Sequence, residues 1–419
     1  MKNKLYLCID LKSFYASVEC VERGIDPFKV NLVVADPTRG NGSVCLAITP
    51  AMKALGIKNR CRFFEIPKSV QYITAMPQMR KYMKVSAEIY SVYLEYISSD
   101  DIYVYSIDEC FIDITDYCRL YQKTPREIAV MLMNAVYDKT GICSAAGIGT
   151  NMFLCKVALD ITAKHAKDFI GYLDEEEFKK IWTHQPITDI WNIGRGTAAR
   201  LEKFGIIDLK GVAEFSEERL YKEFGINAKH LIDHAHGREP CTIKDIHEYK
   251  PKSTSISNGQ VLFKDYSYND ALIVMKEMVY SQVLELVEKR LVTDSISLHI
   301  CYSKDVYRPT GASRKIGEFT NSYKKLSEHF EEIFRETTNR YFPVRRINIG
   351  LNNLQDDLYT TITFFTDIQA EEKERKLQET IVGLRNKYGK NTVLKGISYL
   401  ENATARERNK MVGGHNGEE

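Results

Sequence analysis

Features that mark secreted, membrane and zinc-binding proteins are scarce in this sequence. The ten cysteines include no C-x-x-C pair, which argues against a structural zinc site and is consistent with a reducing compartment. His230, His234 and His236 have no carboxylate or cysteine at ligand spacing, so we interpret them as surface or packing residues. No apolar run is long enough to cross a bilayer, and the chain begins with a predicted strand rather than a basic and apolar leader. We therefore expect a cytoplasmic protein without a membrane partner.

A large excess of charge of either sign is also missing. The 58 Lys and Arg residues nearly balance the 56 Asp and Glu residues, which leaves a formal net charge of +2. This value neither indicates nor excludes a nucleic-acid partner, because a groove can be locally basic on a nearly neutral protein. The 419 residues are enough for two to four domains.

Acidic residues stand at the ends of predicted strands. The apolar strand predicted at 5–9 is followed by Asp10, and Asp108 and Glu109 lie between two further strand-forming runs. If the first strand lies beside the one that ends at Ile107, three carboxylates converge. Three carboxylates are the minimum for a site with two divalent ions about 4 Å apart, and their oxygens suit hard cations. Alternatively, Asp10 caps the following helix and the other two acids are turn residues.

Three sequence blocks around these acids resemble the signature motifs of the Y-family translesion DNA polymerases. The blocks are Asp10-x-x-x-Phe14-Tyr15-Ala16-Ser17-Val18-Glu19, Ser106-Ile107-Asp108-Glu109, and Gly147-Ile148-Gly149-x-Asn151 with Lys156. They occur in the family's order and at roughly its spacing. The resemblance extends from about residue 4 to residue 354, and it is to the UmuC-like branch that includes UV-damage repair proteins of Gram-positive bacteria.

The resemblance implies an α+β fold, that of a multidomain right-hand polymerase. Its expected parts are a ferredoxin-like palm at 1–23 and 77–168, small fingers at 24–76, a helical thumb with a helix-hairpin-helix at 169–240, a linker at 241–252, an α/β little finger at 253–355, and a partly disordered C-terminal extension at 356–419. The order of predicted strands and helices in the first of these regions independently favours a split βαβ, ferredoxin-like unit. The tail from residue 406 contains Gly413-Gly414 and is expected to be disordered.

Periodicity and capping signals place the main elements. Helices are predicted at 14–21, 51–55, 77–98, 125–139, 151–164 and 269–289, and strands at 31–35, 44–48, 142–148, 295–302 and 346–351. The last two strands alternate polar and apolar residues, which predicts a sheet with one apolar face and one polar face that needs a partner.

Two regions have the character of DNA-binding surfaces. Gly194 and Gly196 join short helical segments in the pattern of a helix-hairpin-helix, whose free N–H groups bind a phosphate without reading its base. An ordinary turn is the alternative. The polar sheet face would take positive charge from Arg314, Lys315, Lys324, Lys325, Arg345 and Arg346. An ordinary solvated surface is the alternative there.

The resemblance also implies a reaction, in which a primer 3′-hydroxyl attacks a dNTP on primed template DNA and pyrophosphate leaves. Asp10, Asp108 and Glu109 would be catalytic and would hold two Mg²⁺ ions, or Mn²⁺, together with the carbonyl of Leu11. The dNTP would contact Phe14, Tyr15, Lys53 and Lys156. Tyr15 would be the steric gate that excludes a 2′-hydroxyl, although core packing alone can explain Phe14 and Tyr15.

The implied role is error-prone bypass of damaged template in DNA repair and the SOS response. Phe364-Phe365 lies where relatives carry a sliding-clamp-binding peptide, although Thr361 replaces its glutamine. A recombinase or accessory subunits are further partners to consider. One alternative is a palm-type nucleotidyl cyclase, which the thumb-like hairpin disfavours. The other is a catalytically silent polymerase-like scaffold of a mutasome, which the presence of all three acids disfavours.

Overall fold

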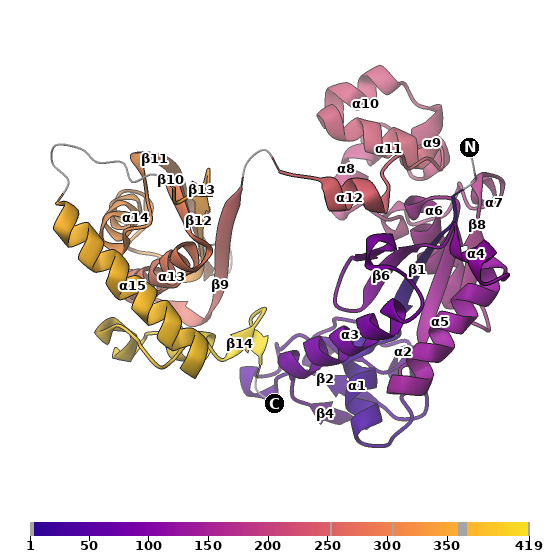
Figure 1. The fold of residues 1–419 in the computed structure, drawn as a ribbon, viewed down its shortest axis with the longest axis horizontal. Helices are drawn as coiled ribbons and strands as arrows, with labels where there is room; N and C mark the ends of the chain where they lie inside the picture. The colour runs from indigo at the N-terminus through magenta and orange to yellow at the C-terminus, as the bar shows by residue number, and fades with distance from the viewer. Residues whose placement is uncertain (1–3, 252–253, 304–305, 359–366, 418–419) are drawn as a thin grey trace. The chain divides into compact units, whose positions relative to one another are not determined.

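The chain folds into two units that divide between Tyr249 and Lys250, and a five-stranded sheet organises the first of them (Figure 1). The computed structural model describes residues 4–251, 254–303, 306–358 and 367–417. In sheet order the strands are β5 (Ile102–Val104), β6 (Glu109–Asp113), β1 (Tyr6–Leu11), β7 (Ser144–Gly149) and β8 (Ile170–Leu173). The central strand β1 is almost wholly buried, as its apolar sequence predicts.

The neighbours of β1 differ in one respect from the expectation. Strand β1 pairs antiparallel with β6 and with β7, so it lies beside the strand that begins at Glu109 and not beside one that ends at Ile107. Residues 105–108 form the connection between β5 and β6. The amides of Tyr105 and Ser106 both donate to the carbonyl of Glu109, each at 3.0 Å, and so tie this connection to β6. The acidic turn is therefore anchored on the strand next to β1.

Local signals explain where the regular helices of this unit begin and end. Helix α5 (Pro125–Thr140) has Pro125 in its first turn, and Thr124 and Glu127 form a reciprocal capping box. Gly141, with φ of 68°, ends the helix. The predicted helix at 125–139 is thereby confirmed. Helices α1 (Phe14–Glu22), α2 (Pro50–Ala54) and α3 (Met79–Leu94) likewise match their predicted positions, with α3 shorter at both ends.

The helix predicted at 151–164 forms, but not as one regular α-helix. It divides into α6 (Met152–Val157), a π-helical turn (Ala158–Thr162) and a 3-10 turn (Ala163–His165). This segment lies unusually close to the sheet. A Cβ atom on Gly147 of β7 would stand 2.0 Å from the carbonyl oxygen of Cys155, so only glycine permits the approach.

Two smaller groups of elements complete the first unit. Residues 24–76 contain α2 and a three-stranded sheet of β3 (Ala47–Ile48), β2 (Leu32–Val34) and β4 (Ile73–Ala75) with its own small core. After β8 come short helices that pack around a separate apolar cluster. These helices are α7 (Glu175–Lys180), α8 (Arg195–Glu202), α9 (Leu209–Glu214), α10 (Glu217–Phe224) and α11 (Ala228–Ala235). Helix α12 (Ile243–Glu248) packs instead on β5 and β6 of the central sheet, where Ile243 joins the core.

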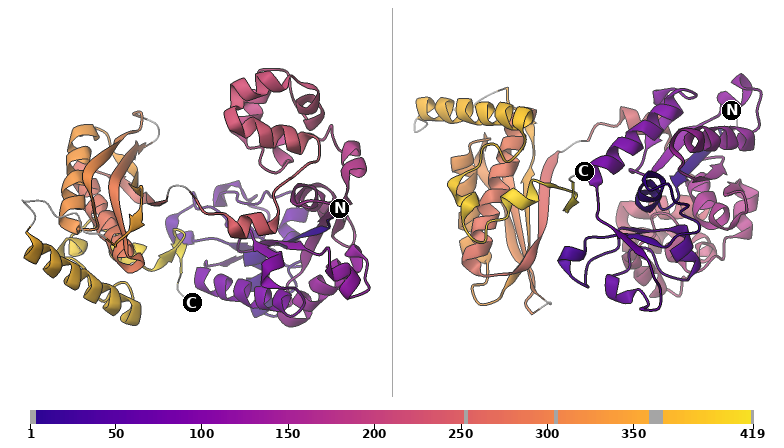
Figure 2. Two further views of the ribbon diagram at one scale, coloured as in Figure 1. Left: turned by 45° about the horizontal axis from the view of Figure 1, so that its top comes forward. Right: turned by 90° about the horizontal axis from the view of Figure 1, so that it is seen from below.

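The second unit is a five-stranded antiparallel sheet with helices on one face (Figure 2). In sheet order its strands are β11 (Thr310–Thr320), β10 (Leu291–Tyr302), β12 (Val344–Asn352) and β9 (Ser255–Tyr266), and β13 (Gln355–Asp356) pairs with the start of β10. Helices α13 (Tyr268–Lys289) and α14 (Tyr323–Thr337) cover the apolar face. Ile296, Leu298 and Ile300 are buried there, which confirms the predicted alternation.

The C-terminal extension is part of this second unit. Helix α15 (Ile368–Tyr388) packs on α13, and α16 (Ala405–Arg408) and the short strands β14 (Met411–Val412) and β15 (His415–Asn416) follow. The buried carboxylate of Glu277 on α13 accepts hydrogen bonds from the amides of Thr404 and Ala405 at 2.8 and 3.1 Å. The expected disorder from residue 406 is therefore wrong for residues 406–417. Within the described ranges, no helix has both the length and the apolar character of a membrane span.

Candidate active site

The register of the central sheet brings the three acidic residues together. Asp10 on β1 stands directly opposite Glu109, the first residue of β6. Asp108 precedes Glu109, and its carbonyl accepts a hydrogen bond of 2.8 Å from the amide of Leu11. Backbone pairing thus brings the three residues to one end of the sheet, and the joint use of their carboxylates stays a prediction.

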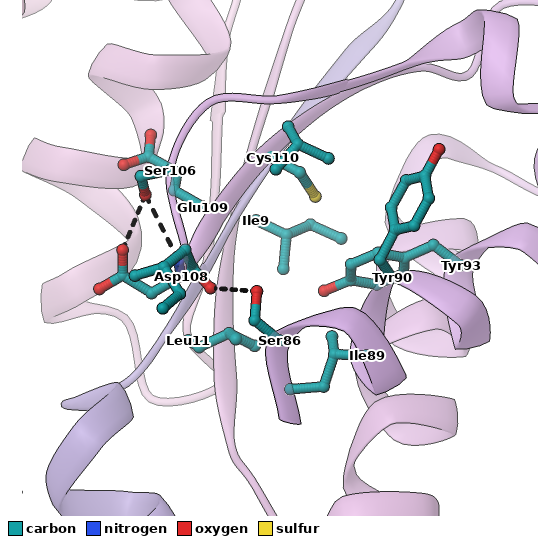
Figure 3. A pocket seen from close by; sticks show the side chains of 12 residues that line it. Ile9, Leu11, Ser86, Ile89, Tyr90, Tyr93, Ser106, Asp108, Glu109 and Cys110 are labelled. Carbon is teal, nitrogen blue, oxygen red and sulfur yellow. Dashed lines mark hydrogen bonds between the residues drawn. The ribbon is translucent and has the colours of Figure 1, made fainter. Parts of the chain in front are cut away.

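Side chains from neighbouring elements hold the acidic turn in place (Figure 3). The Ser106 hydroxyl donates to Asp108 Oδ1 at 2.7 Å, and the Ser86 hydroxyl of α3 donates to the Ile107 carbonyl at 2.6 Å. A cavity of about 30 Å³, lined by residues of α3, β1 and this turn, lies beside it. The turn is thus tied to a helix as well as to the sheet.

Glu109 is oriented by two buried partners. Its Oε1 lies 2.8 Å from the Lys156 ammonium and accepts a hydrogen bond of 3.1 Å from the Cys8 thiol. Lys156 also pairs with Asp160 at 2.9 Å and is almost fully buried. Burial acts against its charge, but Cys8, Glu109 and Asp160 outweigh burial and raise the pKa of Lys156. Contact between Lys156 and a triphosphate stays a prediction, and the geometry makes the lysine a partner of Glu109.

Asp10 lies in a more crowded electrostatic environment. Burial raises the pKa of Asp10 to about 6, Lys164 and Lys156 oppose this rise, and Asp108 and Glu109 add to it. Like charges that are brought close together and partly desolvated disfavour the ionised form. A bound cation would relieve that repulsion.

The residues fit a divalent cation by their chemistry. In the described part of the chain, no three His, Cys, Asp or Glu side chains are already arranged as a metal site. The three carboxylates do not form such a group because the Glu109 carboxylate is turned toward Lys156 and Cys8, and the Asp108 carboxylate toward Ser106. Carboxylate oxygens with a backbone carbonyl nevertheless form the donor set that Mg²⁺ prefers.

Three further lysines, Lys12, Lys53 and Lys164, lie within electrostatic range of Asp10. The electrostatic environments of Lys12 and Lys53 both include Asp10 and Lys164, and burial lowers the pKa of each lysine while Asp10 opposes that effect. Lys164 is half exposed and pairs with Asp160 at 2.7 Å. Lys53 thus lies within electrostatic range of Asp10 and Asp108, and its contact with a dNTP stays a prediction. Sequence reasoning missed Lys164, although its spacing of four residues from Asp160 was a usable signal.

A sharp bend between β1 and α1 positions the two aromatic candidates. Ser13 has φ of 50°, in the left-handed region, and immediately precedes the helix. Phe14 is only 2% exposed, so its side chain belongs to the core. The Tyr15 ring stacks on Tyr82 of α3 with centroids 4.6 Å apart. Burial raises the pKa of Tyr15, and the charge of Asp108 adds to the rise.

The candidate DNA contacts lie in two regions, the turn at Gly194 and Gly196 and the sheet of the second unit. Gly194 is the N-cap of α8 and Gly196 lies in its first turn, and a Cβ on either would meet no atom within 4 Å, so this backbone is open. In the second unit, Lys315 and Arg346 lie opposite Ser295 and Cys301 of β10, whose side chains belong to the face without helices.

Arg314 and Lys325 do not supply charge to that face, contrary to the expectation. Arg314 stands opposite the inward-facing Ile296 and pairs with Glu332 and Glu336 of α14 at 3.1 and 2.6 Å. Since neighbouring residues of a strand point to opposite faces, Arg314 and Lys315 cannot share one. Lys325 pairs with Glu318 and Glu371 at 2.8 and 2.6 Å. Arg345 lies 3.7 Å from Asp265.

Of the three histidines in the helical region, His230 and His236 are exposed, and His234 is buried and has an acidic partner. His234 is buried, stacks on Phe153 at 4.2 Å and on Trp191 at 5.9 Å, and lies 2.9 Å from Glu239. The packing interpretation therefore suits His234. The expectation that no carboxylate lies nearby was wrong, because Glu239 follows the helix in a turn that folds back.

Comparisons with known proteins give consistent results. The model of the impB/mucB/samB family matches residues 9–160, and the model of its C-terminal domain matches residues 253–364. A protein of Bacillus subtilis (strain 168) that carries the name UV-damage repair protein UvrX is 32% identical, over 99% of this chain and 98% of its own. DNA polymerase IV 2 of the same strain is 31% identical, over 99% of both chains.

A solved structure shares the fold. It is a chimera of the Y-family DNA polymerases Dbh and Dpo4, with a TM-score of 0.65 and 21% identity, and the match covers 84% of this chain and 99% of that one. The α+β multidomain architecture expected from the sequence is confirmed. Residues from 365 onward, which include helix α15, lie beyond both family models.

Proposed function

Because the chain belongs to the impB/mucB/samB family of Y-family DNA polymerases, we propose that it extends primers on damaged template DNA by nucleotidyl transfer from dNTPs. The observation that carries this proposal is the register pair of Asp10 and Glu109, with Asp108 beside them, at one end of the central sheet. The names of the relatives, which refer to DNA polymerase and to UV-damage repair, support it.

In the proposed mechanism, Asp10, Asp108, Glu109 and the Leu11 carbonyl hold two divalent ions, Mg²⁺ or Mn²⁺. The chemistry supplied by such ions is a lower pKa for the attacking 3′-hydroxyl and neutralisation of phosphate charge. Lys156 and Cys8 keep the Glu109 carboxylate in one orientation until the substrates bind. The protein's task is therefore positioning and charge balance, as in other phosphoryl transfers.

The remaining roles follow from position. Lys53 and Lys164, which both interact electrostatically with Asp10, are the cations that meet the triphosphate, and Tyr15 is the steric gate that faces the sugar. Under this proposal the palm is 1–23 with 77–168, the fingers are 24–76, the thumb is 169–240 and the little finger is 253–355. The backbone at Gly194 and Gly196 and the side chains of Lys315 and Arg346 contact DNA phosphates.

The biological setting is also proposed from the family. It is lesion bypass within the SOS response in the cytoplasm, with a recombinase or accessory subunits as partners. The clamp-binding segment at Phe364-Phe365 lies outside the described residues. Among the alternatives, a cyclase needs no primed template and a silent scaffold needs no intact acids, so both are separable by experiment.

The test is primer extension by the full chain with Mg²⁺, on an undamaged template and on one with a thymine dimer. The double variant Asp108→Asn, Glu109→Gln should lose activity by a factor of about 10³ or more, because the ion site is lost. Asp113→Asn, on the same strand but paired with Lys4, is the matched control and should stay active. Equal extension by the double variant would refute the assigned site, and inactive wild type that still binds DNA would favour the scaffold.

A further inference from the structure

The proposed gate residue rests against a second aromatic ring. Tyr15, in the first turn of α1, and Tyr82, in the first turn of α3, have ring centroids 4.6 Å apart and planes inclined by 20°. Tyr82 is fully buried, whereas Tyr15 is partly exposed. The Tyr82 ring therefore fills the space into which the Tyr15 ring would have to move in order to leave the site.

The Tyr82 ring is itself fixed by a buried hydrogen bond. Its hydroxyl donates to Glu19 Oε1 at 2.7 Å, and Glu19 is fully buried on α1, where Arg23 also binds it. Burial raises the pKa of Tyr82, and Glu19 adds to the rise, so the phenol remains a donor across the working pH range. Glu19 lies one helical turn after Tyr15, so the bond fastens α3 to the helix that carries the gate.

We propose that Tyr82 is a positioning residue for sugar discrimination, because it prevents the Tyr15 ring from withdrawing when a ribose 2′-hydroxyl approaches. This inference rests on the proposed function, in which Tyr15 is the gate. A steric clash excludes a competing substrate only if the clashing side chain cannot move away, and a close-packed buried neighbour holds that side chain in place. Tyr82 does not touch the nucleotide, and its effect passes through Tyr15.

The test compares insertion of dCTP and CTP opposite template dG by the full chain, as the ratio of the two kcat/KM values. Tyr82→Leu and Tyr82→Met remove the ring face, and each should lower the dCTP-to-CTP ratio by about tenfold while insertion of dCTP changes little. Tyr82→Phe keeps the ring and loses only the bond to Glu19, so it should lower the ratio by less. Two variants that remove the ring are compared, so that the test still stands if one of them fails to fold.

Two controls separate the possible failures. Val92→Ala, at a buried position of the same helix, should destabilise the fold without changing the ratio. Tyr15→Ala should admit CTP. If Tyr15→Ala admits CTP but neither ring-removing variant changes the ratio, the role of Tyr82 is refuted and the gate stands. If Tyr15→Ala still inserts dCTP and leaves the ratio unchanged, Tyr15 is not the gate and the role of Tyr82 is refuted with it. If the wild type inserts neither nucleotide, the proposed function fails and the inference fails with it.

Discussion

At the scale of single residues, each acid of the site has a partner of its own. Glu109 has Lys156 and Cys8, Asp108 has the hydroxyl of Ser106, and Asp10 has the electrostatic influence of Lys164. Separate partners limit the repulsion that three neighbouring carboxylates would otherwise experience. The site can therefore remain folded before cations and substrate arrive.

Lys164→Ala should weaken dNTP binding. Removing one flexible cation beside Asp10 should raise KM for the dNTP by about tenfold, the usual size of one charge-assisted contact. Lys167→Ala is the matched control, since Lys167 is exposed three residues further along the chain. Steady-state insertion kinetics measure both, and an unchanged KM in Lys164→Ala would remove this lysine from the triphosphate site.

Glu239→Gln should change how the first unit responds to acid. Burial acts to raise the pKa of Glu239, but the hydrogen bonds from His234 and the Cys241 amide outweigh it, and the pKa is lowered. The ionised group thus adds stability that is fully present above its ordinary pKa of 4.5 and is lost as pH falls through the lowered value.

Denaturant unfolding at pH 7 and pH 4 measures this contribution. Glu239→Gln should lose about 1–3 kcal/mol of unfolding free energy at pH 7, and its stability should vary less across the acidic range than that of the wild type. Trp182 and Trp191 are the only tryptophans and both lie in the first unit, so their fluorescence follows this unit alone. Parallel pH profiles for the two proteins would contradict the assignment.

At the scale of elements, helix α3 supports both halves of the site. Tyr82 stacks on Tyr15, the proposed gate residue, and the hydroxyl of Ser86, one turn later, donates to the carbonyl of Ile107. Ser86→Ala should free the acidic turn and lower kcat by about tenfold. Ser91→Ala is the matched control, because the Ser91 hydroxyl also donates 2.6 Å to a carbonyl, but to Glu88 of its own helix. Equal kcat in the two variants would show that the turn needs no support from α3.

The contact between β7 and α6 depends on glycine. In Gly147→Ala, the new Cβ would overlap the Cys155 carbonyl, so we expect a loss of about 3 kcal/mol or more in the stability of the first unit. Gly383→Ala, inside α15 and in open space, should instead stabilise its helix by up to about 1 kcal/mol. Thermal unfolding compares the two, and a tolerated alanine at 147 would contradict the packing described here.

Sequence reasoning succeeded where the signals were local. The capping signal at Thr124 and Pro125, the alternation along β10 and the motifs around Asp10 and Glu109 all predicted elements that the structure contains. It failed where tertiary packing decides. The π-helical turn after α6 follows from close approach to the sheet, and the side of the sheet on which Arg314 lies depends on register.

At the scale of the whole molecule, two units with separate cores share one chain. The second includes an extension that lies beyond both family models and shields the carboxylate of Glu277. Buried polar groups that lose their partners are costly, so the extension should be required for the stability of its unit.

A chain that ends at residue 366 should therefore have a less stable second unit. It loses the Thr404 and Ala405 amides that bind Glu277, and the apolar contacts of Ile381. Circular dichroism should detect an earlier melting step, while the tryptophan-monitored transition of the first unit stays in place. A single unshifted transition by both methods would mean that the extension is dispensable.

The position of β1 inside its sheet has a consequence for how activity is lost. Its backbone is paired on both sides, so the amides next to Asp10 and Glu109 should be among the last in the first unit to exchange their hydrogens with solvent. Short helices such as α8 and α9, which are not part of this sheet, should open earlier. If α8 contacts the template as proposed, mild heating should weaken template binding while the three acids keep their positions, and activity should return on cooling.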